Sequence, residues 1–220
     1  MAATFTPRLD VLPVAQRRLW PRLSEVPGGF VLYGGTAIAL HLGHRQSVDF
    51  DFFGGADFDP DQLYAAIPFL SGSRVVQKSA STLTCIVAAD APVQLSFFGT
   101  PALGRVEPPL RAPDINLAVA GLLDLAGTKA AVVQKRAEAK DYIDIDALVG
   151  AGGVSLGLAL AAGRRLYGSA FNPEITLKAL SYFADGNLAS LPAAIRDRLA
   201  AAVRDVELDC LPDLPGPPHG

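Results

Sequence analysis

The stretch VLYGGTAIALHLGHRQSVDFDFFG, residues 31–54, decides the fold. A short apolar segment runs into Gly34 and Gly35, and an apolar segment of helical composition then extends from Thr36 to about Gly43. A segment rich in valine and phenylalanine follows and ends at another pair of glycines. This order predicts a strand, a short helix that begins at Thr36, and a second strand, which together make a compact sheet unit.

Two aspartates alternate with phenylalanines in the second of these strands. Because successive side chains of a strand point to opposite faces, Asp49 and Asp51 are predicted to share one face, while Phe50 and Phe52 pack into the interior. Two carboxylates this close are costly to ionise together, and a divalent cation such as Mg²⁺ or Mn²⁺ relieves the repulsion. Such an ion can bridge nucleotide phosphates. The plainer alternative is a strand that has solvated aspartates on its wet face.

The glycines favour the first interpretation. Gly34 and Gly35 lie between a strand and a helix start, where backbone N–H groups can approach an anion and the helix N-terminus favours negative charge. Thr36 is predicted either to cap the helix or to donate its hydroxyl to a phosphate. Taken alone, a pair of glycines at such a place is most often only a turn.

Thirteen residues separate Gly35 from Asp49 in this arrangement of a glycine pair, a helix and an Asp-x-Asp strand. The arrangement resembles the signature of the DNA polymerase β-like nucleotidyltransferase superfamily. More narrowly, it is similar to the AbiEii/AbiGii toxin family, whose segment runs Gly-Gly-Thr-Ala-x-Ala and then Arg-x-Ser-x-Asp-hydrophobic-Asp. Arg45, Ser47, Asp49 and Asp51 match those positions.

A second block, LLDLAGTKAAVVQKRAEAKDYIDIDALV at residues 122–149, resembles the downstream block of the same family. On a continuous helix at about 100° per residue, positions 129, 136 and 140 would lie within about 40° of each other, whereas a break near residues 137–139 would loosen that geometry. The plainer alternative is a solvated basic face in which an Arg-Asp or Lys-Asp pair joins two helices. The positions that match the family's block are Lys129, Arg136, Lys140, Asp141 and Asp144.

The resemblance implies roles for three of these charges. Lys129 and Lys140 would face the aspartate pair across a cleft and neutralise triphosphate charge, while Asp141 would orient a lysine or help to activate the acceptor. Polymerase-like transferases usually add a third carboxylate from a neighbouring strand, expected here over residues 92–99. Gln94 and Ser96 occupy the matching face of that segment, and neither is a carboxylate.

Three alternatives follow from the missing carboxylate. Asp141 or Asp144 supplies its function, the substrate activates the acceptor, or the protein binds nucleotides without transferring them. The last alternative makes the chain a catalytically degenerate nucleotide-binding module.

The remaining pattern indicates an α+β (mixed α/β) fold. Residues 1–110 are predicted to form a nucleotidyltransferase-like core, residues 111–210 a helical subdomain that completes the cleft, and residues 211–220 a flexible tail. Asp59 and Pro60 predict the start of a helix that runs to about residue 70. Strands are predicted over residues 74–78, 82–89 and 92–99, and helices over residues 117–134, 140–149, 156–166, 173–183 and 191–208.

Composition limits the partners and the location. The formal net charge of -3 gives no general attraction to nucleic acid or anionic lipid, so a bound polyanion needs a local basic patch. The uncharged residues 147–163 are shorter than the roughly 20 residues of a membrane span, which predicts no membrane association. Cys85 and Cys210 show no metal or disulfide spacing and are expected to be free thiols in a reducing cytoplasm.

We therefore expect a metal-dependent nucleotidyltransferase that moves NMP from an NTP to a hydroxyl acceptor. The resemblance makes tRNA or another RNA the leading acceptor, and it implies a toxin of a type IV-like toxin-antitoxin pair with an antitoxin as partner. Transfer to a small molecule is the enzymatic alternative. The expected catalytic residues are Asp49, Asp51, Lys129, Lys140 and Asp141, the metal ligands are Asp49 and Asp51, and the nucleotide-binding residues are Gly34, Gly35, Thr36, Arg45, Ser47 and Arg136.

Overall fold

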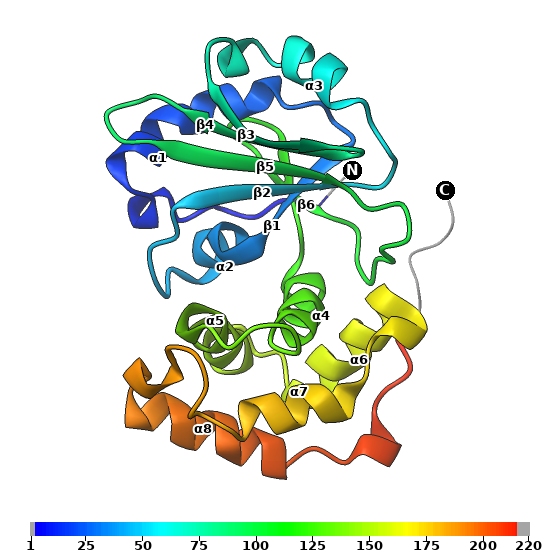
Figure 1. Cartoon of the computed structure of the whole chain (residues 1–220). Coiled ribbons are helices and arrows are strands. Elements are labelled where there is room, and N and C mark those ends of the chain that lie inside the picture. Colours follow the sequence, from blue (N-terminus) through cyan, green and yellow to red (C-terminus); the bar gives the residue numbers. More distant parts are fainter. Residues whose placement is uncertain (1–2, 215–220) are drawn as a thin grey trace. The chain divides into compact units, whose positions relative to one another are not determined.

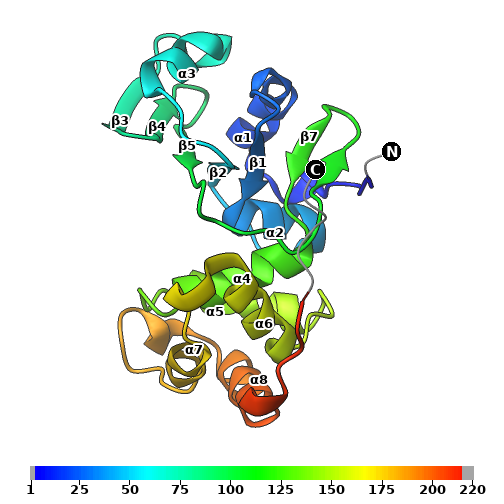
Figure 2. The same cartoon turned by 90° about the vertical axis from the view of Figure 1, so that its right-hand side faces the viewer.

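A computed structural model describes residues 3–214. The chain divides into two compact units (Figure 1, Figure 2). The sheet unit comprises the chain up to Leu103 together with Pro109–Ala120, and the helical unit comprises Gly104–Pro108 together with the chain from Gly121 onward. The expected mixed α/β fold class is confirmed. The domain limits of 110 and 210 stay a prediction, and of the expected tail, residues 215–220 lie outside the described part of the chain.

Seven strands among residues 3–214 form one mixed sheet in the order β3-β4-β5-β2-β1-β7-β6. The strand that carries the aspartates, β2, lies antiparallel to β1 and parallel to β5. The strands are β1 (Phe30–Tyr33), β2 (Asp49–Gly54), β3 (Arg74–Ser79), β4 (Thr82–Val87), β5 (Val93–Gly99), β6 (Leu110–Ala112) and β7 (Leu117–Val119).

The interior face of β2 is aromatic. Phe50 and Phe52 are fully buried, and the ring of Phe52 stacks on that of Phe97 at a centroid distance of 5.0 Å. Phe30 packs edge-on against the same Phe97 ring at 5.4 Å. Each buried phenylalanine contributes about 1.5–3 kcal/mol of burial free energy, so the strand that presents the aspartates is held firmly on its other side.

Three α-helices among residues 3–214 belong to the sheet unit: α1 (Val14–Leu19), α2 (Gly34–Leu42) and α3 (Pro60–Ala66). Helix α2 packs on β1 and β2, and Figure 1 shows it across the sheet from α1 and α3. It begins at Gly34, two positions before the predicted start, because the glycine pair itself joins the first turn. Asp59 caps α3 as predicted, accepting hydrogen bonds from the N–H groups of Asp61 and Gln62 at 2.8 and 3.1 Å.

The helix predicted over residues 117–134 is wrong in its first part. Leu117–Val119 forms β7, which pairs with β1 and with β6, and the helix α4 begins only at Leu122. A short apolar run such as residues 117–120 fits a buried strand and a buried helix equally well by periodicity. The pairing of Val119 with Leu32, which is distant in sequence, decides for the strand.

The helical unit contains five α-helices within the described residues. The predicted helices near 140–149 and 156–166 are confirmed almost to the residue, while those near 173–183 and 191–208 are shorter than predicted. No helix among residues 3–214 combines the length and the hydropathy that crossing a bilayer would require. The five helices are α4 (Leu122–Val132), α5 (Ala139–Val149), α6 (Leu156–Tyr167), α7 (Pro173–Leu180) and α8 (Ala193–Arg204).

Candidate active site

The aspartates share one face of β2, as the alternation predicts. Asp49 and Asp51 are partly exposed, whereas Phe50 and Phe52, which alternate with them along the strand, are buried. In the parallel register with β5, Gln94 stands beside Asp49 and Ser96 beside Asp51. The sheet therefore holds two carboxylates next to each other on one open face.

Gly34 brings the start of α2 up to this pair of carboxylates. Its φ of +74° is rarely adopted by residues with a side chain, and a Cβ at this position would lie 2.5 Å from Asp51 Oδ2. The sequence can thus place only glycine here without moving Asp51. Because the first N–H groups of a helix have no partner within it, this arrangement sets hydrogen-bond donors for an anion beside Asp51.

Arg45 and Ser47 lie over the next glycine. A Cβ on Gly35 would collide with Arg45 Nη2 and would lie 3.0 Å from Ser47 Oγ. Arg45 also donates from Nη1 to the carbonyl of Gln46 at 2.8 Å, which fixes the course of its side chain. The structure thus gathers the predicted residues Gly34, Gly35, Arg45, Ser47 and Asp51 at one helix start.

Thr36 does not cap α2. The cap position is Tyr33, which makes no side-chain capping hydrogen bond, and Thr36 lies inside the first turn with 1% of its surface exposed. Its hydroxyl donates to the backbone carbonyl of Asp49. Because that hydrogen bond joins α2 to β2, Thr36 fixes the helix start relative to the aspartates. Its predicted contact with a phosphate stays a prediction.

The position beside Asp51, where the sequence resemblance leads us to expect a third carboxylate, is closed. Ser96 is 3% exposed, and its Oγ lies 3.4 Å from Thr84 Oγ1 on β4. Among residues 3–214 no group of three or more histidine, cysteine, aspartate or glutamate side chains could hold a metal ion. Oxygen donors on this face include the two carboxylates and the side-chain amide of Gln94.

The second block forms a buried ion cluster within the helical unit. Lys129 Nζ on α4 lies 2.6 Å from Asp141 Oδ1 and 2.7 Å from Asp144 Oδ2, both on α5. Both aspartates have no exposed surface, and Lys129 is 6% exposed. The chain is not one continuous helix here, because α4 ends at Val132 and α5 begins at Ala139. The structure contains the ion pair between two helices that the plainer interpretation expects, but the pair is buried and does not belong to a solvated basic face.

Arg136 completes the cluster from the turn between the two helices. Its Nε donates to Asp141 Oδ2 at 2.7 Å and its Nη2 to Asp141 Oδ1 at 3.2 Å. Burial alone would raise the pKa of Asp141, but hydrogen bonds from Arg136 and the charge of Lys129 outweigh it and lower that pKa. A carboxylate with a lowered pKa is a poor proton acceptor, so the geometry suits Asp141 to orienting Lys129.

Lys140 lies outside this cluster. Its side chain is 50% exposed, and its Nζ lies 3.0 Å from Glu138 Oε2. That Lys129 and Lys140 face the aspartate pair across a cleft stays a prediction. The list of expected site residues omitted Asp144, although its spacing of three residues from Asp141 puts both carboxylates on the same side of a helix.

The family of the chain follows from a sequence match over most of its length. The sequence model for the nucleotidyl transferase AbiEii toxin of the type IV toxin-antitoxin system matches residues 18–214. The chain belongs to the AbiEii family. The resemblance drawn from the two motifs is confirmed, and as an AbiEii member the chain is a nucleotidyltransferase of a toxin-antitoxin family.

Other known proteins are similar to this AbiEii member in sequence or in fold. An uncharacterized protein of Aquifex aeolicus is 32% identical over 158 residues, which cover 71% of this chain and 74% of that protein. The nucleotidyltransferase toxin MenT4 from Mycobacterium tuberculosis is 17% identical, with a TM-score of 0.51 over 91% of this chain and 84% of that one. A candidate nucleotidyltransferase from H. pylori is 15% identical, with a TM-score of 0.51 over 86% and 92%. At such low identity the two structures support the fold alone.

Proposed function

We propose that this AbiEii member transfers NMP from an NTP to a hydroxyl of an RNA, with tRNA as the leading acceptor, and that it uses a divalent cation. The observation that supports this most strongly is the common face of Asp49 and Asp51, with Gly34 of α2 in close approach to Asp51. Strand β2 then offers carboxylates for a cation, and the start of α2 offers N–H donors for the phosphates that this cation accompanies.

The residues on this face fit one Mg²⁺ or Mn²⁺ ion. Mg²⁺ is commonly bound by one or two carboxylates together with substrate phosphates and water, and Asp49 and Asp51 meet that requirement. When bound, such an ion supplies charge that stabilises the in-line displacement at the α-phosphate. Because Ser96 is buried and uncharged, the donor set suits a single ion better than two.

Other residues of the chain would bind the triphosphate and position the helices. The first turn of α2 and the guanidinium of Arg45 would bind the triphosphate, and Ser47 would support that contact from above Gly35. In the helical unit, Arg136 and Lys140 are exposed, whereas Lys129 is held between Asp141 and Asp144 and would position the α4–α5 pair.

The buried cluster also bears on how the acceptor is activated. Asp141 and Asp144 are fully buried and ion-paired, which makes either of them a poor substitute for the third carboxylate. Because the family is one of nucleotidyltransferases, activation of the acceptor hydroxyl by the substrate is then the alternative that we propose. The new bond joins the acceptor oxygen to the α-phosphorus, pyrophosphate leaves, and the hydroxyl proton passes to a phosphate oxygen.

The test is a transfer assay with the full chain. Each of the four NTPs, labelled at the α-phosphate, is incubated with Mg²⁺ and total RNA, and the labelled RNA is resolved by electrophoresis. We expect a labelled band that disappears in Asp49→Asn and Asp51→Asn. Asp10→Asn, which removes an exposed carboxylate elsewhere on the sheet unit, is the matched control and should retain activity.

The outcomes separate the alternatives. No labelled product with any NTP, together with normal growth of cells that express the chain, would contradict the proposal and favour a nucleotide-binding module. A labelled small molecule found by mass spectrometry, without labelled RNA, would favour the small-molecule transferase. An adjacent gene for an antitoxin that restores growth would support the toxin role.

A further inference from the structure

A groove of about 320 Å³ lies in the helical unit, lined by the α4–α5 turn, α7 and the segment that follows α7. Three cations and two tyrosines contribute to its lining, together with one anion, Asp185. We call it the basic groove. Its cations and tyrosines are Lys135, Arg136, Lys178, Tyr142 and Tyr182.

The lysines of the basic groove are available to a ligand. Lys135 and Lys178 are exposed, and neither forms an ion pair with any of residues 3–214. The side chain of Arg136 is 45% exposed while it also contacts Asp141. Lys129, by contrast, is buried between two aspartates and cannot reach a polyanion from its present position. In a chain of net charge -3, the basic groove is therefore a local concentration of accessible positive charge.

An aromatic side chain stands next to these charges. Tyr182 is 54% exposed, and the neighbouring Ile175 is 46% exposed, so the groove has an apolar wall open to solvent. Tyr142 forms its floor, with 1% exposure and a hydroxyl that donates to the carbonyl of Ala179 at 3.1 Å. Cations beside an exposed aromatic ring are the arrangement that binds single-stranded nucleic acid, because phosphates meet the cations while bases stack on the ring.

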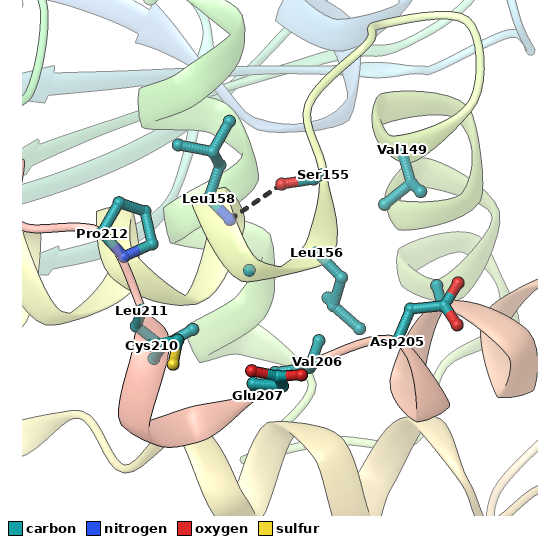
Figure 3. A pocket seen from close by; sticks show the side chains of 12 residues that line it. Val149, Ser155, Leu156, Leu158, Asp205, Val206, Glu207, Cys210, Leu211 and Pro212 are labelled. Carbon is teal, nitrogen blue, oxygen red and sulfur yellow. Dashed lines mark hydrogen bonds between the residues drawn. The ribbon is translucent and has the colours of Figure 1, made fainter.

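Two other cavities of the described chain lack this combination. A cavity of about 420 Å³ beside the start of α6 carries the carboxylates of Asp205 and Glu207 and no lysine or arginine in its described lining (Figure 3). A cavity of about 360 Å³ in the sheet unit has one cation, Arg111, whose Nη1 donates to the carbonyl of Asn116 at 2.7 Å. Of these three cavities, the basic groove is therefore the one whose charge suits a polyanion.

We propose that the basic groove binds a single-stranded segment of the RNA acceptor, with Lys135 and Lys178 on its phosphates and Tyr182 stacked on a base. The identity of the acceptor rests on the proposed function. The volume lies at the lower end of the range of about 300–1,000 Å³ for ligand sites, which suits one unpaired nucleotide rather than a duplex.

Binding is tested by fluorescence anisotropy with a labelled single-stranded RNA dodecamer of mixed sequence and with a duplex of the same length. The groove variants are Lys135→Gln combined with Lys178→Gln, and Tyr182→Ala. Arg164→Gln combined with Arg204→Gln is the matched control, because it removes two exposed cations from the helical unit outside the groove. Thermal melting of each variant verifies that the fold is retained.

The two groove variants should weaken binding in different ways. The double lysine variant should lower the slope of log Kd against log salt by about 1.4 between about 50 and 200 mM salt, at about 0.7 per lost phosphate contact to a single strand. Tyr182→Ala should raise the Kd at least about fivefold at unchanged salt slope. Both should affect the single strand more than the duplex, whereas the arginine control should affect both RNAs less than the lysine variant does.

Transfer to RNA, measured in parallel, separates this inference from the proposed function. Labelled RNA from the wild type together with an unchanged Kd in both groove variants would contradict RNA binding by the basic groove and leave the proposed function intact. Groove-dependent binding without labelled RNA would support the groove and contradict the proposed function. A poly-glutamate peptide that binds more tightly than RNA, and less tightly to the groove variants, would assign the groove to an acidic protein instead.

Discussion

Lys129 Nζ lies 2.6 Å from Asp141 Oδ1, and this contact joins α4 to α5 inside the helical unit. Asp144 approaches the same ammonium at 2.7 Å, so a single lysine neutralises part of the charge of two fully buried carboxylates. A buried charge that loses its partner costs far more than an exposed one, because water cannot replace the lost interaction. The cluster therefore serves stability whatever further part it has in the reaction.

Lys129→Met should strongly destabilise the helical unit. The substitution keeps an unbranched side chain of nearly the same length but leaves Asp141 and Asp144 without the shared ammonium, which for a buried pair costs about 3–5 kcal/mol. Urea unfolding of the full chain, followed by circular dichroism, measures the loss. Lys140→Met is the control, since its exposed pair with Glu138 should contribute at most about 1 kcal/mol. Equal losses in the two variants would refute the structural role of Lys129.

Stability should fall in acid through Asp141. Its pKa is lowered in the folded protein, chiefly because hydrogen bonds from Arg136 and the charge of Lys129 overcome the effect of burial. The folded state thus favours the ionised form, and the stabilisation is complete above the unfolded pKa of about 3.9 and is lost as the pH falls through the lower folded value. Urea unfolding from pH 7 to pH 3 should show a shallower acid decline for Asp141→Asn than for Asp10→Asn. The same decline in both variants would rule out this contribution.

Gly34→Ala should disturb the site and the fold together. Alanine would have to adopt a φ near +74° and its Cβ would meet Asp51 Oδ2, so we expect a loss of about 1–3 kcal/mol in the free energy of unfolding and a large loss of transfer. Gly29→Ala is the matched control, because nothing lies within 4 Å of the added Cβ and the φ of Gly29 is not in the left-handed region. Wild-type stability and transfer in Gly34→Ala would show that the helix start does not depend on this close approach.

Ser96→Asp should strengthen the thermal response of the chain to Mg²⁺. Ser96 is the register partner of Asp51 on the parallel strand β5, so a carboxylate there adds repulsion that a divalent cation can relieve. We expect a lower Tm without divalent cation and a larger rise on adding Mg²⁺ than in the wild type, with each kcal/mol of binding worth roughly 2–4 °C. Ser96→Asn, of similar shape but uncharged, controls for packing. Identical responses to Mg²⁺ in the two variants would argue against a cation site on this face.

Local sequence patterns determined how the residues of the site are placed on their strand and helix. Alternation along β2 predicts that Asp49 and Asp51 share a face, because the period of two is a property of any extended backbone. The glycine pair at the start of α2 and the cap at Asp59 depend likewise on neighbours within a few residues. The two motifs together also predicted the family, which the match over residues 18–214 confirms.

Tertiary contacts decided the rest. Nothing within residues 117–120 distinguishes a strand from a helix, and the pairing of Val119 with Leu32 settles it. Thr36 is tied to the carbonyl of Asp49, and Lys129 is buried between two aspartates, because packing brings together groups that lie 12 or more residues apart. A sequence pattern records the type and spacing of charges. Whether a charge meets solvent or an opposite charge depends on which elements pack around it, and only the folded chain determines that.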